Sequence, residues 1–266
     1  MDYLESILLG VVQGLTEFLP ISSSGHLEIS KVILGNTISN KESLLFTIVL
    51  HTATAFSTIF FFRKDLLEIF KGLFLKTHNE SHDFSISIII SMIPAVFVGL
   101  FYEEAINSLF NGNLVLVGSM LYLTALLLFL SDFLKIKKNE IGFKNSFLIG
   151  LAQAIAILPG ISRSGATIAS AVIMGIDREK AARFSFIMVI PLILGSMAKS
   201  LLDQGISFES FDLISLLLGF VSAFVTGLFA CRWMISLVKQ SKLYYFSIYC
   251  FIVGSIIIYY SLNNGL

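Results

Sequence analysis

Long apolar stretches separated by short polar segments dominate the chain. Six of them approach the roughly 20 residues that a helix needs to span the hydrocarbon core of a bilayer. They cover residues 44–62, 84–101, 114–130, 184–202, 211–231 and 243–262. Because a helix satisfies its own backbone hydrogen bonds in lipid, the pattern predicts an all-α polytopic membrane protein with six spans.

Four further apolar stretches are too short to cross a bilayer alone. They cover residues 3–19, 25–34, 147–158 and 165–176, and they form two pairs, each interrupted by Pro, Gly and Ser. Irregular backbone at membrane depth is tolerated only where it is buried in protein or lines a wet cavity. We therefore expect each pair to be a re-entrant helical hairpin that enters and leaves on the same side.

Composition supports one transmembrane domain over residues 1–266. The chain is 56% hydrophobic and 14% charged, against about 25% charged residues in an average soluble domain. Its formal net charge is zero, so no basic surface indicates a nucleic-acid partner. Acidic Asp2 and Glu5 stand where a signal peptide would carry Lys or Arg, which predicts no cleavable leader.

Basic residues set the expected orientation. Fourteen of the 18 Lys and Arg residues lie in four segments, with four, four, three and three in residues 63–76, 135–144, 178–183 and 232–242. If these segments are cytoplasmic, all six spans alternate correctly and both termini lie outside. The first hairpin then enters from outside and the second from the cytoplasm.

The two hairpins resemble each other. GVVQGLTEFLPISSSG begins at Gly10 and GLAQAIAILPGISRSG at Gly150, and Gln13 matches Gln153 at a separation of 140. Each half then holds one hairpin and three spans, with repeat one at about 1–133 and repeat two at about 141–262. An odd number of spans makes the second half an inverted copy of the first. Chance similarity between apolar segments is the competing explanation, and agreement with the charge pattern favours the repeat.

Polar side chains cluster at both interruptions. Gln13 and Glu17 are four apart and share a helix face. Beyond them come Ser22, Ser23, Ser24 and His26 in the first hairpin, and Ser162, Arg163, Ser164 and Thr167 in the second. A charged residue at the centre of a spanning helix costs about 2.5–3.5 kcal/mol on insertion scales, so buried charges indicate a function.

An anion site explains this cluster better than a purely structural pair of Glu17 and Arg163, which accounts for neither His26 nor the hydroxyls. Arg163 offers a fork for phosphate oxygens. The backbone N–H groups of Gly25 and Gly165, at expected helix starts, add donors. The carboxylate fits either a divalent cation that bridges phosphates or a group that orients a histidine.

A nucleophile candidate beside a base candidate extends the anion site to phosphoryl transfer. His26 lies three residues past Ser23 and two past Ser24, within reach of a hydroxyl across a tight loop. The spacing does not choose between the two serines.

QGLTEFLPISSSGHL together with PGISRSGAT resembles the undecaprenyl-diphosphate phosphatases of the bacitracin-resistance type. Their signatures are (E/Q)xxxE running into Ser-Ser-x-Gly-His, and PGxSRSxxT; both are present in order. The resemblance implies hydrolysis of undecaprenyl diphosphate at the outer face of the bacterial cytoplasmic membrane, with Mg²⁺ or Ca²⁺. By motif position, the essential residues are Glu17, Ser23, His26 and Arg163.

Gln13 is the glutamine form of the first motif position and offers a neutral oxygen, which argues against a mechanism with two carboxylates. Glu17 is therefore the strong metal-ligand candidate of this segment, with Gln13 as the second expected ligand. The diphosphate is expected on Ser22, Ser24, Gly25, Ser162, Ser164, Gly165 and Thr167, beside Arg163. Ser23 would attack the terminal phosphorus or orient the attack, with His26 transferring the proton; attack by His26 itself or by water stays open. Expected partners are a polyprenyl diphosphate lipid and membrane lipids, with a homodimer as the candidate assembly.

Other classes of membrane protein share some of these sequence features. A secondary transporter or lipid flippase would share inverted repeats, broken helices and an anion site, yet it needs no nucleophile beside a base. A structural membrane protein leaves the buried charges unexplained. His51 is a functional suspect because it lies mid-span, but the half-repeat places it opposite Pro191, which favours helix packing. Cys231 and Cys250 lie in apolar stretches and are expected to be packing residues.

Overall fold

The computed structural model describes residues 2–34, 40–75, 77–109, 112–133, 139–203, 212–240 and 242–264. These residues form helices and short connections, with one isolated bridge between Asn139 and Ile176. The helices are α1 Tyr3–Phe18, α2 Ser23–Ile33, α3 Asn40–Phe61, α4 Arg63–Leu73, α5 Glu80–Phe101, α6 Glu103–Asn107, α7 Leu114–Phe133, α8 Phe143–Ile155, α9 Arg163–Ile173, α10 Arg178–Asp203, α11 Leu213–Lys239 and α12 Leu243–Asn264. The predicted all-helical fold is confirmed.

Five helices of the described chain are long and apolar enough to cross a membrane: α5, α7, α10, α11 and α12. A sixth span is obtained if α3 and α4, which are bent by 74° at their junction, count as one broken span. These helices coincide with the six predicted stretches, and the protein is a multi-pass membrane protein. Lys76 and residues 135–138, which belong to the first two basic segments, lie outside the described residues.

The short apolar stretches form two helix pairs, α1–α2 and α8–α9. Helix α1 ends at Phe18 because Pro20 restricts the preceding residue, and Leu19 is extended at φ −69° and ψ 141°. Ser22 caps the start of α2, and Ser162 caps the start of α9. Pro, Ser and Gly thus end one helix and start the next within a few residues, as the sequence predicts.

The two interhelical connections pack against each other. A Cβ on Gly25 would lie 3.2 Å from Cα of Gly160, and one on Gly165 would lie 3.2 Å from Cβ of Pro20. The Ser164 hydroxyl donates to the carbonyl of Leu19 at 3.3 Å. Gly160 has φ +97°, and a Cβ there would meet a carbonyl oxygen of α7 at 2.4 Å, so this position requires glycine.

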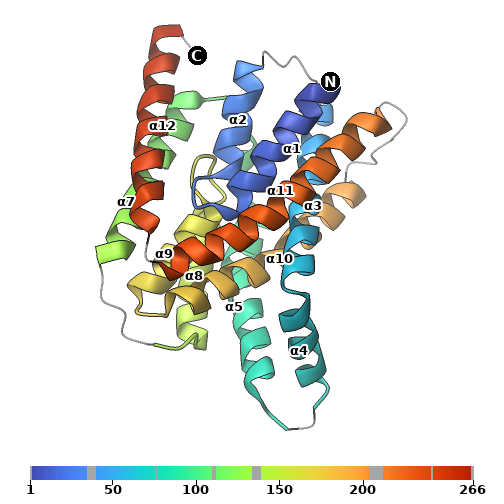
Figure 1. The fold of residues 1–266 in the computed structure, drawn as a ribbon, viewed down its shortest axis with the longest axis vertical. Coiled ribbons are helices and arrows are strands. Elements are labelled where there is room, and N and C mark those ends of the chain that lie inside the picture. Colours follow the sequence, from blue (N-terminus) through green and yellow to red (C-terminus); the bar gives the residue numbers. More distant parts are fainter. Residues whose placement is uncertain are drawn as a thin grey trace.

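Close helix crossings hold these connections in place (Figure 1). Helix α1 contacts α11, and a Cβ on Gly10 would lie 2.0 Å from the Ser222 hydroxyl. Helix α8 contacts α5, and a Cβ on Gly150 would lie 2.4 Å from the Ser91 carbonyl. Helices α7 and α12 run side by side. Small residues permit these approaches, as is usual between membrane helices.

A buried ion pair ties three helix ends together away from the two connections. Arg178 at the start of α10 pairs with Asp132 near the end of α7, and both side chains are at most 7% exposed. The other oxygen of Asp132 accepts from the backbone N–H of Tyr244 at the start of α12, at 2.7 Å. Cys231 and Cys250 are buried and free, as expected of packing residues.

Candidate active site

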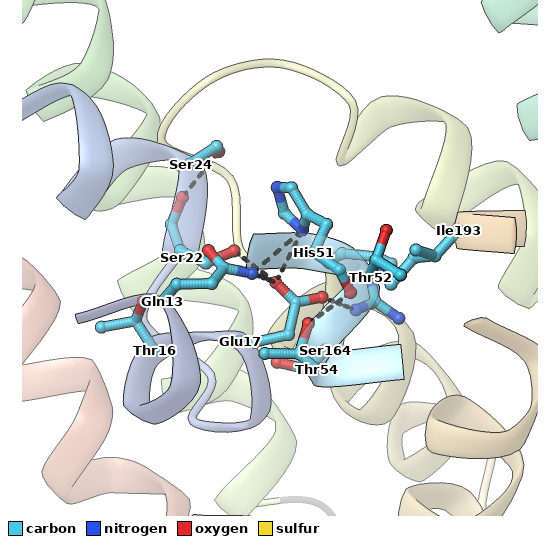
Figure 2. A network of polar contacts seen from close by, with 12 residues as sticks. Gln13, Thr16, Glu17, Ser22, Ser24, His51, Thr52, Thr54, Ser164 and Ile193 are labelled. Carbon is cyan, nitrogen blue, oxygen red and sulfur yellow. Dashed lines mark hydrogen bonds and ion pairs between the residues drawn. The ribbon is translucent and has the colours of Figure 1, made fainter. Parts of the chain in front are cut away.

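Glu17 is the centre of a buried polar network at the end of α1 (Figure 2). One carboxylate oxygen accepts from Nη2 of Arg163 on α9. The other accepts from the Ser23 hydroxyl at 2.7 Å and from Nε2 of Gln13 at 2.9 Å. The Glu17 residue is 6% exposed, so Arg163 compensates a carboxylate that burial alone would strongly disfavour. The network joins both helix pairs, as predicted.

Gln13 lies one turn before Glu17 on the same face, as the spacing predicts, and is fully buried. Its Nε2 also lies 3.0 Å from Nδ1 of His51, which comes from α3. His51 Nδ1 is in turn 3.4 Å from the Glu17 carboxylate. Three elements of the first half and one of the second therefore converge on a single carboxylate.

The two connections use their serines in the same way. Ser22 Oγ accepts from the Gly25 N–H at 3.2 Å, and Ser162 Oγ accepts from the Gly165 N–H at 3.0 Å. These N–H groups were expected to be free donors for an anion, and the structure gives them to the serine caps instead. A serine at the N-cap satisfies a helix donor that would otherwise be unpaired.

The remaining predicted binding residues are engaged mainly within the scaffold. Ser24 Oγ lies 3.4 Å from Ser22 Oγ, and Ser164 Oγ lies 3.3 Å from Ser162 Oγ. Thr167 contacts the Ser185 hydroxyl at 2.7 Å. These side chains line or brace the connections, whereas Ser23 and Arg163, the first residues of α2 and α9, hydrogen-bond to Glu17 directly.

His26 is held on a separate set of partners. Its Nδ1 lies 2.8 Å from the Ser22 carbonyl, which can only accept, so Nδ1 carries the proton. Nε2 is then the basic nitrogen of neutral His26, and it lies 2.8 Å from the Tyr249 hydroxyl of α12. The two rings stack with centroids 5.6 Å apart. Ser23 donates to Glu17 rather than to His26.

Two residues at the site were not predicted. His51 was expected to pack against a neighbouring helix, and the structure instead places it on Gln13 and Glu17. Its only sequence signal was a histidine in the middle of a span. Tyr249, which meets His26, lies in an aromatic stretch of the last span with no signal to distinguish it from lipid-facing neighbours.

A family model for the bacitracin resistance protein BacA matches residues 6–256. The chain belongs to this family. It is 58% identical over 254 residues to an undecaprenyl-diphosphatase of Christiangramia forsetii, covering 96% of each chain. It is 48% identical over 265 residues to one of Bacteroides thetaiotaomicron, covering 97% of this chain and 98% of the relative. One of Methanobrevibacter smithii is 36% identical over 280 residues, covering 99% of both.

Two buried polar atoms of this BacA-family site have no hydrogen-bond partner in the part of the chain that the structure describes. They are Nη1 of Arg163 and Oε1 of Gln13. Buried polar groups are normally satisfied, so these two atoms indicate a ligand or ordered water. A guanidinium donor fits an anion, and an amide oxygen beside a carboxylate fits a hard cation.

The described residues include no group of three or more His, Cys, Asp or Glu side chains that could hold a metal ion. A cation here would take protein oxygens from Glu17 and Gln13 and its other ligands from phosphate or water. Mg²⁺ is often bound in this way, through one or two protein oxygens and substrate phosphates. The donor set therefore fits a divalent cation that arrives with a phosphorylated substrate.

Proposed function

We propose that this protein hydrolyses undecaprenyl diphosphate to undecaprenyl phosphate and inorganic phosphate. The observation that carries the proposal is the Glu17 carboxylate, which binds the Ser23 hydroxyl and Arg163 at the same time. A hydroxyl nucleophile, a proton acceptor and an anion-binding fork are thereby brought together. The relatives described above carry the name undecaprenyl-diphosphatase.

In the first step, Ser23 Oγ attacks the terminal phosphorus of the diphosphate. The new bond joins Ser23 to phosphorus, the bond to the bridging oxygen breaks, and undecaprenyl phosphate leaves. The hydroxyl proton passes to Glu17, which already accepts it at 2.7 Å. Because phosphoryl transfer depends mainly on positioning and charge stabilisation, Arg163 contributes by stabilising the charge on the equatorial oxygens through Nη1, the nitrogen that it does not use for Glu17.

In the second step, water attacks phosphorylated Ser23 and releases inorganic phosphate. His26 accepts the proton of this water at Nε2, its unprotonated nitrogen, after the water has replaced the Tyr249 hydroxyl that lies 2.8 Å from Nε2. Glu17 returns its proton to the Ser23 oxygen as the bond to phosphorus breaks. His26 then gives its proton to solvent or phosphate, which restores both groups.

Mg²⁺ or Ca²⁺, held by Glu17, Gln13 and phosphate oxygens, would neutralise the charge of the diphosphate when bound. The unpartnered Oε1 of Gln13 supports this assignment. Removal of the cation by EDTA is therefore expected to stop phosphate release.

An inverted repeat, with each half a re-entrant hairpin plus three spans, is part of the proposal. It is supported by matched contacts: α1 packs on α11 while α8 packs on α5, and Gly10 and Gly150 occupy corresponding positions at the two crossings. The basic segments support an active site that opens to the outer side of a bacterial cytoplasmic membrane. A homodimer stays a prediction.

Phosphate release by the purified protein in detergent tests the function. Wild type is expected to release phosphate from undecaprenyl diphosphate with Mg²⁺ or Ca²⁺ and not with EDTA. Ser23→Ala and Arg163→Ala should abolish release. Ser236→Ala and Arg232→Ala serve as matched controls, because both residues are exposed and, in the described chain, neither contacts a residue of the network. A well-folded wild type that binds the lipid but releases no phosphate would favour a lipid transporter instead.

A further inference from the structure

His51 lies beside the proposed reaction centre, yet it has no part in the steps above. It is on α3, and its side chain is 30% exposed. One ring nitrogen, Nδ1, faces Gln13 and Glu17, and the other is turned away from both (Figure 2). Among the described residues, none hydrogen-bonds to this second nitrogen, Nε2. A residue that only packs helices together would have no reason to present a polar atom in this way.

The amide of Gln13 determines which nitrogen of His51 carries the proton. Glu17 is paired with Arg163 and is therefore a carboxylate, so the Gln13 atom 2.9 Å from it must be the NH₂ group. The second hydrogen of that NH₂ group is directed to His51 Nδ1 at 3.0 Å. Nδ1 accepts this hydrogen, so neutral His51 carries its own hydrogen on Nε2.

Glu17 does not compete for this role. The distance from Nδ1 to the carboxylate is 3.4 Å, beyond the range of about 2.7–3.2 Å for good N–H···O bonds. The Gln13 contact is shorter and therefore sets the tautomer. Nε2–H is left as a hydrogen-bond donor that points away from the network.

A second free donor lies on the other side of Glu17. Arg163 uses Nη2 for Glu17, and its buried Nη1 has no partner in the described chain. His51 from the first half and Arg163 from the second thus present two N–H groups that have no partner in the described chain, on either side of one carboxylate. Such donors fit the oxygens of a phosphate or diphosphate group.

We propose that His51 is a substrate-binding residue that holds the diphosphate through Nε2–H, with Gln13 fixing its tautomer through Nδ1. The inference rests on the proposed function and names a further contact of the same site. His51 thereby acts as a neutral donor, and Gln13 acquires a role in orienting it besides its role toward a cation.

Three substitutions separate donation at Nε2 from other roles of the ring. His51→Gln carries an NH₂ group to nearly the same position as Nε2, whereas His51→Asn reaches only the position of Nδ1 and His51→Ala reaches neither. We expect His51→Asn and His51→Ala to raise KM for undecaprenyl diphosphate about 10- to 100-fold, as for one lost hydrogen bond to a charged group. His51→Gln should stay within about 5-fold of wild type, and kcat should change less than KM because the contact is made before and during the reaction.

His78→Asn is the matched control, because the His78 side chain is 68% exposed and lies outside the network. Equal KM values for wild type and His51→Ala would overturn the proposal, as would a loss of activity in His51→Gln as large as that in His51→Ala. If wild type itself releases no phosphate, the proposed function is wrong. Binding of pyrophosphate to wild type, followed by NMR, then still tests whether His51 holds a diphosphate.

Nitrogen NMR of ¹⁵N-histidine-labelled wild type in detergent provides a readout besides activity. The chain has four histidines, so single substitutions assign the signals. The expected His51 spectrum shows hydrogen on Nε2, and this signal should shift when pyrophosphate is added without metal. Hydrogen on Nδ1 of His51, or an Nε2 signal that pyrophosphate leaves unchanged, would overturn the proposal.

Discussion

The two interhelical connections share a scaffold but carry different chemistry. In both, a serine caps the following helix through a glycine N–H, and a second serine lies beside the first. Residues 140 apart in the sequence nevertheless differ where the first half carries its proposed catalytic groups. Ser23 corresponds to Arg163, and His26 corresponds to Ala166. Glu17 corresponds to Ile157, so the second half has no carboxylate of its own at this place.

This difference explains why two similar halves make one site rather than two. The first half supplies a negative charge and the proposed nucleophile, and the second supplies the positive charge. Each buried charge is compensated only by the other half, because Glu17 and Arg163 pair across the interface. The charge balance of the site therefore depends on both halves of the chain.

Glu17→Gln should have the largest effect on stability and activity, because it removes the carboxylate that residues of both connections contact. The buried Arg163 loses its partner, which costs about 3–5 kcal/mol and lowers the melting temperature in detergent on the order of 10 °C. Phosphate release should fall about 10³-fold or more, since Ser23 also loses its proton acceptor. Glu28→Gln is the control, because Glu28 pairs with Lys31 within one helix, at 3.1 Å. An active Glu17→Gln protein would refute the central role of this carboxylate.

Arg163→Lys separates the two contributions of the second connection, because it keeps the positive charge and removes the planar guanidinium group. Arg163 has one N–H group on Glu17 and another free for phosphate, and a lysine cannot serve both in a fixed plane. We expect near wild-type thermal stability and phosphate release lower by about 10²-fold. Arg183→Lys, at a half-exposed pair with Asp65, should leave the rate unchanged. A near wild-type rate for Arg163→Lys would contradict the bidentate role.

Much of this architecture follows from local patterns in the sequence. The spans, the two short helix pairs and the Gln13–Glu17 face depend on apolar length, Pro and Gly positions, and helical spacing, which act over a few residues. The contact between the two connections was also predictable. Irregular, polar backbone at membrane depth requires hydrogen-bond partners, which another polar segment of the protein or water can supply.

The missing parts of the site depend on how distant helices are rotated about their axes. His51 is 38 residues from Gln13, and Tyr249 is 223 residues from His26. Local spacing contains no information on which face of α3 or α12 meets the site. The free N–H groups expected at Gly25 and Gly165 failed for a different reason: a serine three residues earlier competes for the same donor.

Backbone strain at Ser22 is expected to have a smaller effect on stability than the substitutions above. Ser22 has φ +73°, whereas its counterpart Ser162 has φ −75°. A non-glycine residue at positive φ costs about 1–2 kcal/mol, and this cost falls only on the connection that carries Ser23 and His26. The Ser22 carbonyl accepts from Nδ1 of His26 at 2.8 Å, so the strained residue directs a proposed catalytic group.

Ser22→Gly and Ser162→Gly measure this strain as a difference. Both lose a serine cap, at a few tenths of a kcal/mol for glycine, and both gain the same flexibility in the unfolded chain. Only Ser22→Gly also releases the strain, so its melting temperature in detergent should exceed that of Ser162→Gly by on the order of 4 °C. Equal melting temperatures would show that Ser22 is unstrained. A higher melting temperature with slower phosphate release in Ser22→Gly would show that the strain serves to hold His26, and that the two connections differ in backbone energy as well as in side chains.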